Sequence, residues 1–181
     1  MAARALEFAI FTAARTGEVL GARWDEIDLT TKIWTVPAER MKAGREHRVP
    51  LSDPALAILK RVRPLALMRD SKLDPAAPVF PGLRRALPMS NMVFLMLLRR
   101  MKRTDVTAHG FRSTFSDWAA ERTAYPREVV EMVLAHTVEN KVEAAYRRGD
   151  LFDKRRTLMD AWAVFCEATP TGKVVPLRAG G

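Results

Sequence analysis

The chain has 181 residues, of which 48% are hydrophobic, and its formal net charge at pH 7 is +9. This length and apolar content suit one folded domain and exclude a chain that is disordered throughout. The excess of positive charge favours a polyanionic partner, with nucleic acid ahead of an anionic membrane surface.

The single cysteine, Cys166, excludes a disulfide within the chain, which fits a reducing compartment. No apolar run reaches the roughly 18 residues that a membrane span needs, so no membrane partner is expected. The first residues, 1–4, lack the apolar centre of a signal peptide. We therefore expect a cytoplasmic protein.

The first third of the chain is expected to form two helices and a small sheet. Apolar residues dominate positions 3–15, which predicts a buried helix, and a short helix through Val19 and Leu20 should follow. Positions 24–29 and 32–36, around a turn at Thr30 and Thr31, are typical of a hairpin. Residues 48–51 predict a third strand, and a polar loop, 38–46, separates it from the second.

The rest of the chain is expected to be helical. Ser52, Asp53 and Pro54 combine a capping side chain with proline in the first turn, which predicts a helix from there to about Met68. A proline-rich stretch, 70–88, should be mostly loop. Further helices are expected from Ser90 to about Met101, from Thr107 to about Arg122, from Pro126 to near Ala135, over residues 139–148, and from a cap at Asp150 over residues 151–168. The sum predicts a mainly α fold with a small three-stranded antiparallel β-sheet.

The stretch from Thr107 to Tyr146 carries the side chains that indicate chemistry. His109 and Arg112 are three residues apart and so share a helix face; His136 and Tyr146 follow. An arginine fork matches a phosphate, a histidine can donate a hydrogen bond or move a proton, and a tyrosine can be a covalent nucleophile. Together they predict phosphoryl transfer onto a tyrosine.

Five motifs, in this order, resemble those of the tyrosine recombinases, the phage integrase family. They are Ala14-Arg15-Thr16-Gly17-Glu18, Lys42 with the strand His47-Arg48-Val49-Pro50-Leu51 after it, Ala108-His109-Gly110-Phe111-Arg112, Leu134-Ala135-His136, and Ala145-Tyr146. Ala135 stands where the family more commonly has glycine, a change expected to keep the local geometry. The resemblance covers roughly residues 5–167 and is nearest to integrases of prophages and genomic islands.

The resemblance implies the catalytic fold of that family for residues 1–168, with a flexible tail over 169–181. It also implies that the family's first catalytic helix and upstream DNA-binding domains are not in this chain. The function implied is site-specific cleavage and rejoining of DNA strands, for integration and excision of a mobile element.

The resemblance further implies a role for each motif residue. Tyr146 would attack the scissile phosphodiester and form a 3′-phosphotyrosine, while Arg15 and Arg112 would hold the non-bridging oxygens. Lys42 would protonate the leaving 5′ oxygen, and His136 would donate to a phosphate oxygen. His109 would hydrogen-bond the phosphate or take the tyrosine proton, and Glu18 would orient Arg15. Contacts with the DNA backbone are expected from Arg45, His47, Arg99, Arg100, Lys102 and Arg103, although His47 could equally be structural.

The expected partner is double-stranded DNA, bound by a tetramer in which the C-terminal segment, from residue 151 onward, docks on a neighbouring subunit. DNA-bending accessory proteins are further possible partners. No cofactor is expected, because a phosphotyrosine conserves the energy of the cleaved bond. No metal is expected either, because the acidic and cysteine or histidine residues lack the grouping of metal sites.

Other interpretations stay open. A type IB topoisomerase-like enzyme would use the same chemistry without strand exchange, and a non-catalytic basic module would only bind DNA. A helical RNA-binding domain would need an aromatic platform that the sequence lacks. Taken singly, Tyr146 could be an ordinary helix tyrosine, Arg15 could merely pair with Glu18, and Lys42 could be a solvated loop lysine.

Overall fold

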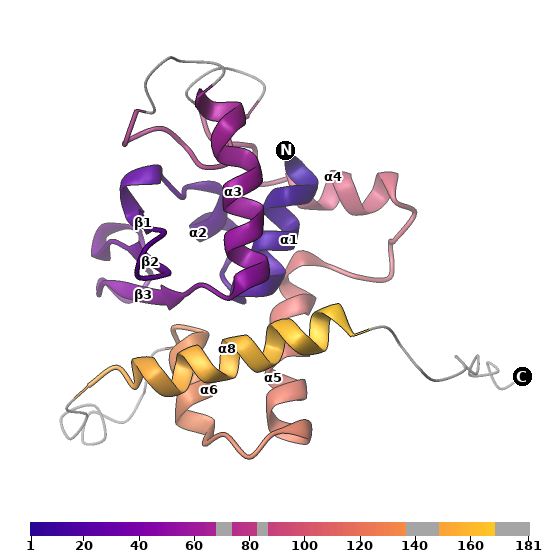
Figure 1. The fold of residues 1–181 in the computed structure, drawn as a ribbon. Helices are drawn as coiled ribbons and strands as arrows, with labels where there is room; N and C mark the ends of the chain where they lie inside the picture. The colour runs from indigo at the N-terminus through magenta and orange to yellow at the C-terminus, as the bar shows by residue number, and fades with distance from the viewer. Residues whose placement is uncertain (68–73, 83–86, 137–148, 169–181) are drawn as a thin grey trace, which may run out of the picture.

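The computed structural model describes residues 1–67, 74–82, 87–136 and 149–168, the side chains of 65–67 excepted. These residues form a mainly helical domain with one small antiparallel sheet, as the sequence predicts (Figure 1). The helices are α1 (Ala2–Thr12), α2 (Thr16–Leu20), α3 (Asp53–Leu67), α4 (Val93–Arg100), α5 (Ala108–Arg122), α6 (Arg127–Val133) and α8 (Phe152–Glu167). The strands are β1 (Ile27–Asp28), β2 (Ile33–Val36) and β3 (His47–Pro50), with 3-10 turns η1 (Trp24–Glu26) and η2 (Ala38–Arg40).

The sheet has the order β1-β2-β3, and both neighbouring pairs are antiparallel. Trp34, at its centre, pairs with Ile27 on one side and with Val49 on the other. The predicted strand over 24–29 is wrong for its first half, because those residues form η1. That turn carries Glu26 inward, where its carboxylate accepts hydrogen bonds from the Trp34 indole at 3.0 Å and from Arg40. A buried carboxylate requires such donors.

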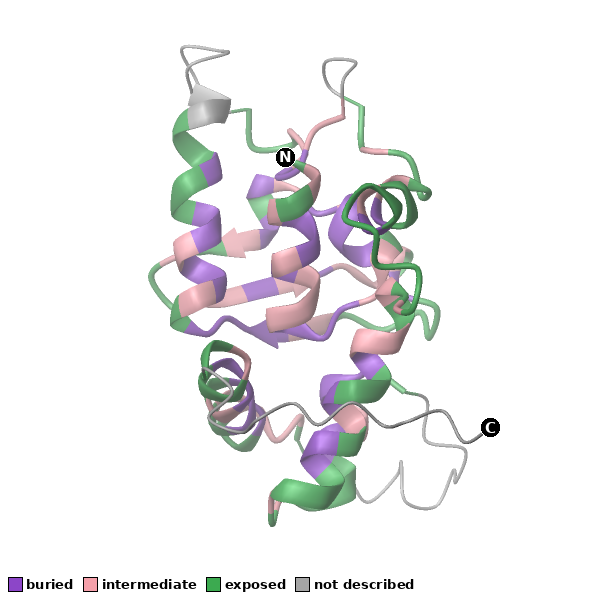
Figure 2. Ribbon diagram, turned by 90° about the vertical axis from the view of Figure 1, so that its right-hand side faces the viewer, coloured by how far each residue is buried: buried purple, intermediate pink, exposed green. Residues whose placement is uncertain are grey.

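Two hydrophobic clusters form the core, and α1 joins them. The first cluster lies between α1, the sheet, α3 and α4, and the second between α5, α6 and α8. Ile10 packs against both. Figure 2 shows the buried residues on the facing sides of these elements. The C-terminal end of α1 therefore lies at the junction of the two clusters.

The first helix ends three residues earlier than predicted, at Thr12 rather than Arg15. Ala13 adopts the left-handed conformation, with φ of 49°, and terminates the helix. The Thr12 hydroxyl turns back to the carbonyl of Phe8 at 2.7 Å. Arg15 then stands in an extended conformation before α2 instead of inside a helix, so its side chain can leave the helix axis toward the junction.

Helix α8 differs from its prediction at its start. Leu151, in the left-handed conformation, is the N-cap residue, whereas the Asp150 carboxylate is bound by Arg48 and Arg155 and does not cap the helix. Helix α8 contacts α1, α3, α6 and β3 of its own chain and crosses the molecule below β3 in Figure 1. Its buried face holds Leu158, Met159, Trp162 and Ala163. This apolar face is therefore already covered within the chain.

The remaining predictions for helices hold with small shifts. Thr107 caps α5 by accepting a hydrogen bond from the Gly110 N–H at 2.9 Å. Helix α4 starts at Val93, later than the predicted start at Ser90. All four tryptophans are buried, as expected: Trp24, Trp34, Trp118 and Trp162. The predicted helix over 139–148 and the tail 169–181 lie outside the described residues.

Within the described ranges, no helix combines the length and apolar character required to cross a membrane. The same ranges hold no group of three or more His, Cys, Asp or Glu side chains arranged to bind a metal ion. Burial raises the pKa of the half-buried Cys166 thiol to about 12, so this thiol stays protonated and acts as an apolar side chain.

Candidate active site

The C-terminal turn of α6 is the centre to which the predicted site residues converge. Ala135 adopts the left-handed conformation, with φ of 49°. Its N–H donates to the Met132 carbonyl at 3.2 Å, and the His136 N–H donates to the Glu131 carbonyl at 3.0 Å. This pair of bonds is the Schellman motif, in which glycine is favoured at the left-handed position. The turn directs the carbonyls of Leu134 and Ala135 toward two arginines and fixes the backbone of His136.

Arg112 joins the ends of two helices. Its guanidinium donates to the carbonyl of Leu134 at 2.8 Å and to the carbonyl of Ala13. Ala13 is the C-cap residue of α1 and Leu134 that of α6, so both carbonyls belong to the negative ends of helix dipoles. Arg112 is 6% exposed. Its position is thus fixed at the junction of the two core clusters.

Arg15 approaches the same junction from the turn between α1 and α2. Its backbone N–H and its guanidinium each donate to the Glu18 carboxylate at 2.8 Å, and the guanidinium also donates to the Ala135 carbonyl at 3.1 Å. Glu18 is 6% exposed. The pair is therefore a buried carboxylate orienting a half-buried arginine, rather than a solvated ion pair of small effect.

The charge of Arg15 acts on the buried guanidinium of Arg112. Burial and then the charge of Arg15 lower the pKa of Arg112 to about 10, while Glu18 acts in the opposite direction. Arg112 thus remains protonated at neutral pH. A guanidinium has five N–H donors, and the hydrogen bonds within the described residues use two of them on each arginine side chain. Donors remain for the oxygens of a bound phosphate.

His136 is oriented by an acidic residue on α6. Its Nδ1 lies 2.6 Å from the Glu131 carboxylate. If Nδ1 carries the proton of that hydrogen bond, Nε2 is left to face other groups, and it can donate only from the imidazolium form. Nearly half of the His136 side chain is exposed, at 46%, so it can reach a ligand that approaches the turn.

His109 lies one turn before Arg112 on α5, as the three-residue spacing predicts. The two side chains line a hollow of about 190 Å³ together with Leu134 and His136; its other lining residues are Ser113, Ser116 and Asp117. Arg15 donates a hydrogen bond to the carbonyl of Ala135, the residue between Leu134 and His136. Four predicted residues from three separate stretches of the chain thus gather around one turn.

The structure does not bring Lys42 to this group. Lys42 and Arg45 are exposed in the connection between η2 and β3, and Lys42 is not among the residues that line the hollow at His109 and Arg112. Tyr146 lies outside the described residues. The basic residues at the end of α4 are exposed, and Arg103 is bound by Asp105 at 2.8 Å; these are Arg99, Arg100, Lys102 and Arg103.

His47 lies on β3, is partly buried, and lines a pocket with Met132, Asp150 and Arg155. Burial and the charge of Arg155 lower its pKa to about 4, with Glu18 and the Val133 carbonyl acting in the opposite direction and Arg15 adding to the lowering. Since its ring faces α6, its placement favours the structural role over a contact with DNA.

The low pKa of His47 predicts a loss of stability in acid. Below about pH 6.5 the unfolded chain binds a proton at this residue that the folded chain does not bind until about pH 4. Stability should therefore fall by on the order of 3 kcal/mol across that interval. Urea unfolding at a series of pH values would measure this fall. In His47→Gln the fall should be smaller by about that amount, and equal falls in both proteins would contradict the placement of His47.

Replacing Ala135 by glycine is expected to stabilise the domain. A left-handed conformation costs a non-glycine residue about 1 kcal/mol or more, and glycine removes that cost without touching the carbonyl that holds Arg15. Ala120, exposed within α5, is the matched control, since Ala120→Gly should destabilise by about 1 kcal/mol. Opposite signs in urea unfolding are expected; a destabilising Ala135→Gly would mean that the turn differs from the one described.

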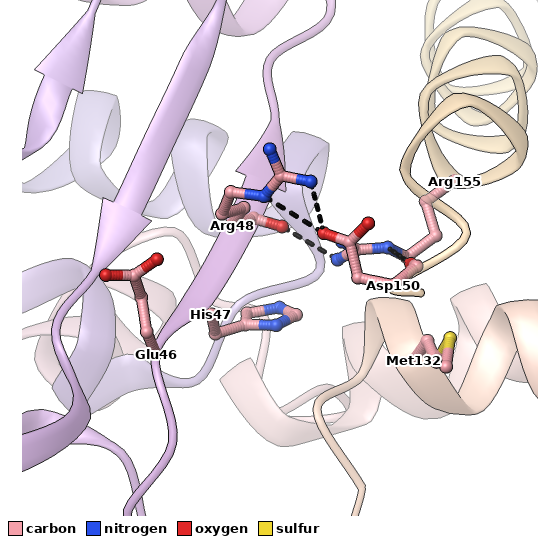
Figure 3. A pocket seen from close by; sticks show the side chains of 6 residues that line it. All are labelled: Glu46, His47, Arg48, Met132, Asp150 and Arg155. Atoms are coloured by element: carbon pink, nitrogen blue, oxygen red, sulfur yellow. Dashed lines mark hydrogen bonds and ion pairs between the residues drawn. The ribbon is translucent and has the colours of Figure 1, made fainter. Parts of the chain in front are cut away.

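The sequence interpretation missed two features of this region. Glu131, which orients His136, lies five residues before it, in the last turn of α6. A carboxylate one turn before the helix cap is the sequence signal that indicates such a partner. The cluster formed by Arg48, Asp150 and Arg155 was also missed (Figure 3). Asp150 resembles an ordinary helix cap in sequence, so no local signal points to its arginine partners.

Residues 2–151 match the protein-family model that is described as the phage integrase family. The prophage integrase IntA of Escherichia coli K12 is 38% identical over 168 residues, which are 92% of this chain and 39% of that protein. The integrase of Enterobacteria phage P4 is 31% identical over 180 residues, covering 90% of this chain and 39% of that protein. The chain spans about two fifths of the length of these curated relatives.

Solved structures share the fold. The integrase from mycobacterium phage Brujita aligns over 88% of this chain and 50% of its own, with a TM-score of 0.64 at 20% identity. The Tn1549 transposon integrase, solved in complex with circular intermediate DNA, aligns over 87% of this chain and 58% of its own, with a TM-score of 0.54 at 15% identity. By the extent of the family match, which covers more than half of its residues, this chain belongs to the phage integrase family.

Proposed function

We propose that this chain is the catalytic part of a site-specific tyrosine recombinase that cuts and rejoins duplex DNA to integrate and excise a mobile element. One observation carries the proposal. Arg15, Arg112 and His136 come from three separate stretches of the chain, yet hydrogen bonds hold all three at one helix end. Two fixed positive charges beside a histidine form a site suited to a DNA phosphate.

In the proposed reaction the Tyr146 phenol attacks the phosphorus of the scissile phosphodiester. The new bond joins the phenol oxygen to phosphorus, the bond from phosphorus to the 5′ oxygen breaks, and the strand leaves as a 5′-hydroxyl. Arg15 and Arg112 stabilise the negative charge that grows on the non-bridging oxygens. His136 adds a hydrogen bond to a phosphate oxygen, and Glu131 orients its ring. A 5′-hydroxyl then attacks the phosphotyrosine, which reverses these steps and restores the DNA strand.

Proton movements are assigned to His109 and Lys42. His109 lines the same hollow as Arg112, which supports a role in binding the phosphate or accepting the phenol proton. Lys42 is proposed as the acid that protonates the leaving 5′ oxygen. Its exposed position on the connection before β3 suits a side chain that meets its ligand only when DNA covers this face.

The proposed partner is double-stranded DNA, which the net charge of +9 supports, and the working form is a tetramer in the bacterial cytosol. A contact with a neighbouring subunit through the C-terminal segment is also proposed, but α8 cannot supply its apolar face, since its own chain covers that face. Deleting 151–181 would remove part of the core. Truncation after residue 168 is the suitable test, and it should weaken assembly on DNA while leaving the unfolding midpoint unchanged.

Strand exchange distinguishes the proposal from a topoisomerase-like activity. The full-length protein containing this chain would be incubated with a supercoiled plasmid carrying both junction sequences of the element that encodes it. The proposal expects plasmid products of changed length, and no such products from Tyr146→Phe. Tyr125→Phe, which changes the only other tyrosine of the chain, is the matched control and should recombine normally. Relaxation without products of changed length would favour the topoisomerase, and DNA binding with neither would favour a non-catalytic module.

A further inference from the structure

Asp150 is held by two arginines at the point where the chain enters α8. Its Oδ2 atom accepts hydrogen bonds from Arg48 Nη2 at 2.6 Å, from Arg48 Nε at 3.0 Å and from Arg155 Nη2 at 2.8 Å. Arg155 also donates to the Asp150 carbonyl and to the Arg48 carbonyl, both at 2.7 Å. Figure 3 shows the three side chains meeting between β3 and the start of α8. We call Arg48, Asp150 and Arg155 the Asp150 clamp.

The clamp places a charged side chain, Arg155, at a buried position where the core would favour an apolar residue. Arg155 is 2% exposed and lies on the same face of α8 as Leu158, Met159 and Trp162, where an apolar side chain would suit the core. Buried ionic clusters seldom stabilise a fold more than apolar packing does, but their hydrogen bonds fix one geometry. The arginine side chains also stack on the Phe152 ring, with Arg48 at 4.5 Å and Arg155 at 5.3 Å from its centre. The clamp thus fixes the backbone of Asp150 relative to β3.

Asp150 lies four residues after Tyr146 in the sequence. Four residues of fully extended chain span at most about 14 Å, so the position of Asp150 limits the volume that the Tyr146 backbone can occupy. On the other side, His136 is fixed by the Schellman turn of α6. The clamp is also near the candidate site, since all three of its residues line one pocket with Met132 of α6, the helix whose C-terminal turn forms the site.

We propose that Arg48 and Arg155 are positioning residues for the nucleophile: by holding Asp150 they limit where Tyr146 can lie and so favour its approach to the phosphate held by Arg15 and Arg112. The inference rests on the proposed function, in which Tyr146 attacks DNA. It assigns the clamp no contact with the substrate. The clamp should therefore affect the rate of attack and leave the affinity for DNA unchanged.

Arg48 is the residue to change, because its side chain is 41% exposed and the bonds between Arg155 and Asp150 stay in place without it. The full-length protein would be reacted with nicked duplex DNA made from its element's junction, and covalent adduct would be timed at saturating DNA. Arg48→Gln should lower this rate about 10- to 100-fold with the Kd for DNA unchanged, and Arg48→Lys should recover much of the loss. Arg61→Gln, which changes an exposed arginine on α3, is the matched control and should leave both the saturated rate and the Kd for DNA unchanged.

Each outcome decides between this inference and its alternatives. An unchanged saturated rate in Arg48→Gln overturns the positioning role, and so does a loss that disappears when the assay is cooled below the unfolding transition, since that loss reflects stability. Asp150→Asn combined with Arg48→Gln should be no slower than the slower single variant, because both remove one interaction; additive losses also overturn the role. A wild-type protein that forms no adduct at all refutes the proposed function instead.

Discussion

Changing Arg112 to lysine is expected to abolish most of the DNA cleavage while retaining the positive charge. Lysine cannot reproduce the planar fork that donates to the carbonyls of Leu134 and Ala13 and still has donors for a phosphate. Removing a fixed donor to the transition-state charge lowers the rate by about 10²- to 10³-fold. The rate of adduct formation at saturating DNA is the measurement, because it separates the chemical step from binding.

Arg122→Lys is the matched control, because Arg122 ends the same helix and is exposed. It should cleave at the wild-type rate. Arg112→Lys should also be destabilised by about 1–3 kcal/mol, because two carbonyls at buried positions lose the guanidinium that donates to them. The assay must therefore be run well below the unfolding midpoint of this variant. Cleavage by Arg112→Lys at the wild-type rate would show that this guanidinium is only a link between the ends of α1 and α6.

Truncating Trp162 should cause the largest loss of stability among single changes in the second core cluster. Its ring lies 5.3 Å from that of Phe115 and 5.1 Å from that of Trp118, and its indole N–H donates to the Ile10 carbonyl at 2.8 Å. Trp162→Ala is expected to lower the free energy of unfolding by about 3–5 kcal/mol. Because Ile10 belongs to α1, the loss should loosen the helix that ends at the candidate site.

Val164→Ala on the same helix is the matched control, since this valine is 70% exposed, and its effect should stay within about 0.5 kcal/mol. Urea unfolding of the isolated 181-residue chain measures both values. Similar small effects in the two variants would mean that α8 does not pack on its own chain, and would restore α8 as the segment that docks on a neighbouring subunit.

The sequence predicted most of the helices because their signals are local. The Thr107 cap and the apolar spacing around it identify α5, and the three-residue step from His109 to Arg112 already places both on one face. The resemblance of five motifs then linked Arg15 and His136 to them. Arg15, Arg112 and His136 lie far apart in the sequence, and in the structure their side chains meet at the C-terminal turn of α6.

What escaped prediction depends on long-range contacts. Nothing local to Asp150 distinguishes a helix cap from an ion-pair partner of Arg48, 102 residues away. The same holds for the start of the sheet. There the Glu26 carboxylate accepts hydrogen bonds from Trp34 and Arg40, and residues 24–26 form a turn where a strand was predicted.

The most direct test of the central claim is to identify which residue becomes covalently attached to DNA. The protein would be trapped on nicked duplex DNA from its element's junction, digested with protease and nuclease, and the modified peptide sequenced by mass spectrometry. We expect a nucleotide on Tyr146, an adduct that persists in Tyr125→Phe, and none in Tyr146→Phe. An adduct on any other residue, or strand joining that proceeds in Tyr146→Phe, would contradict the account.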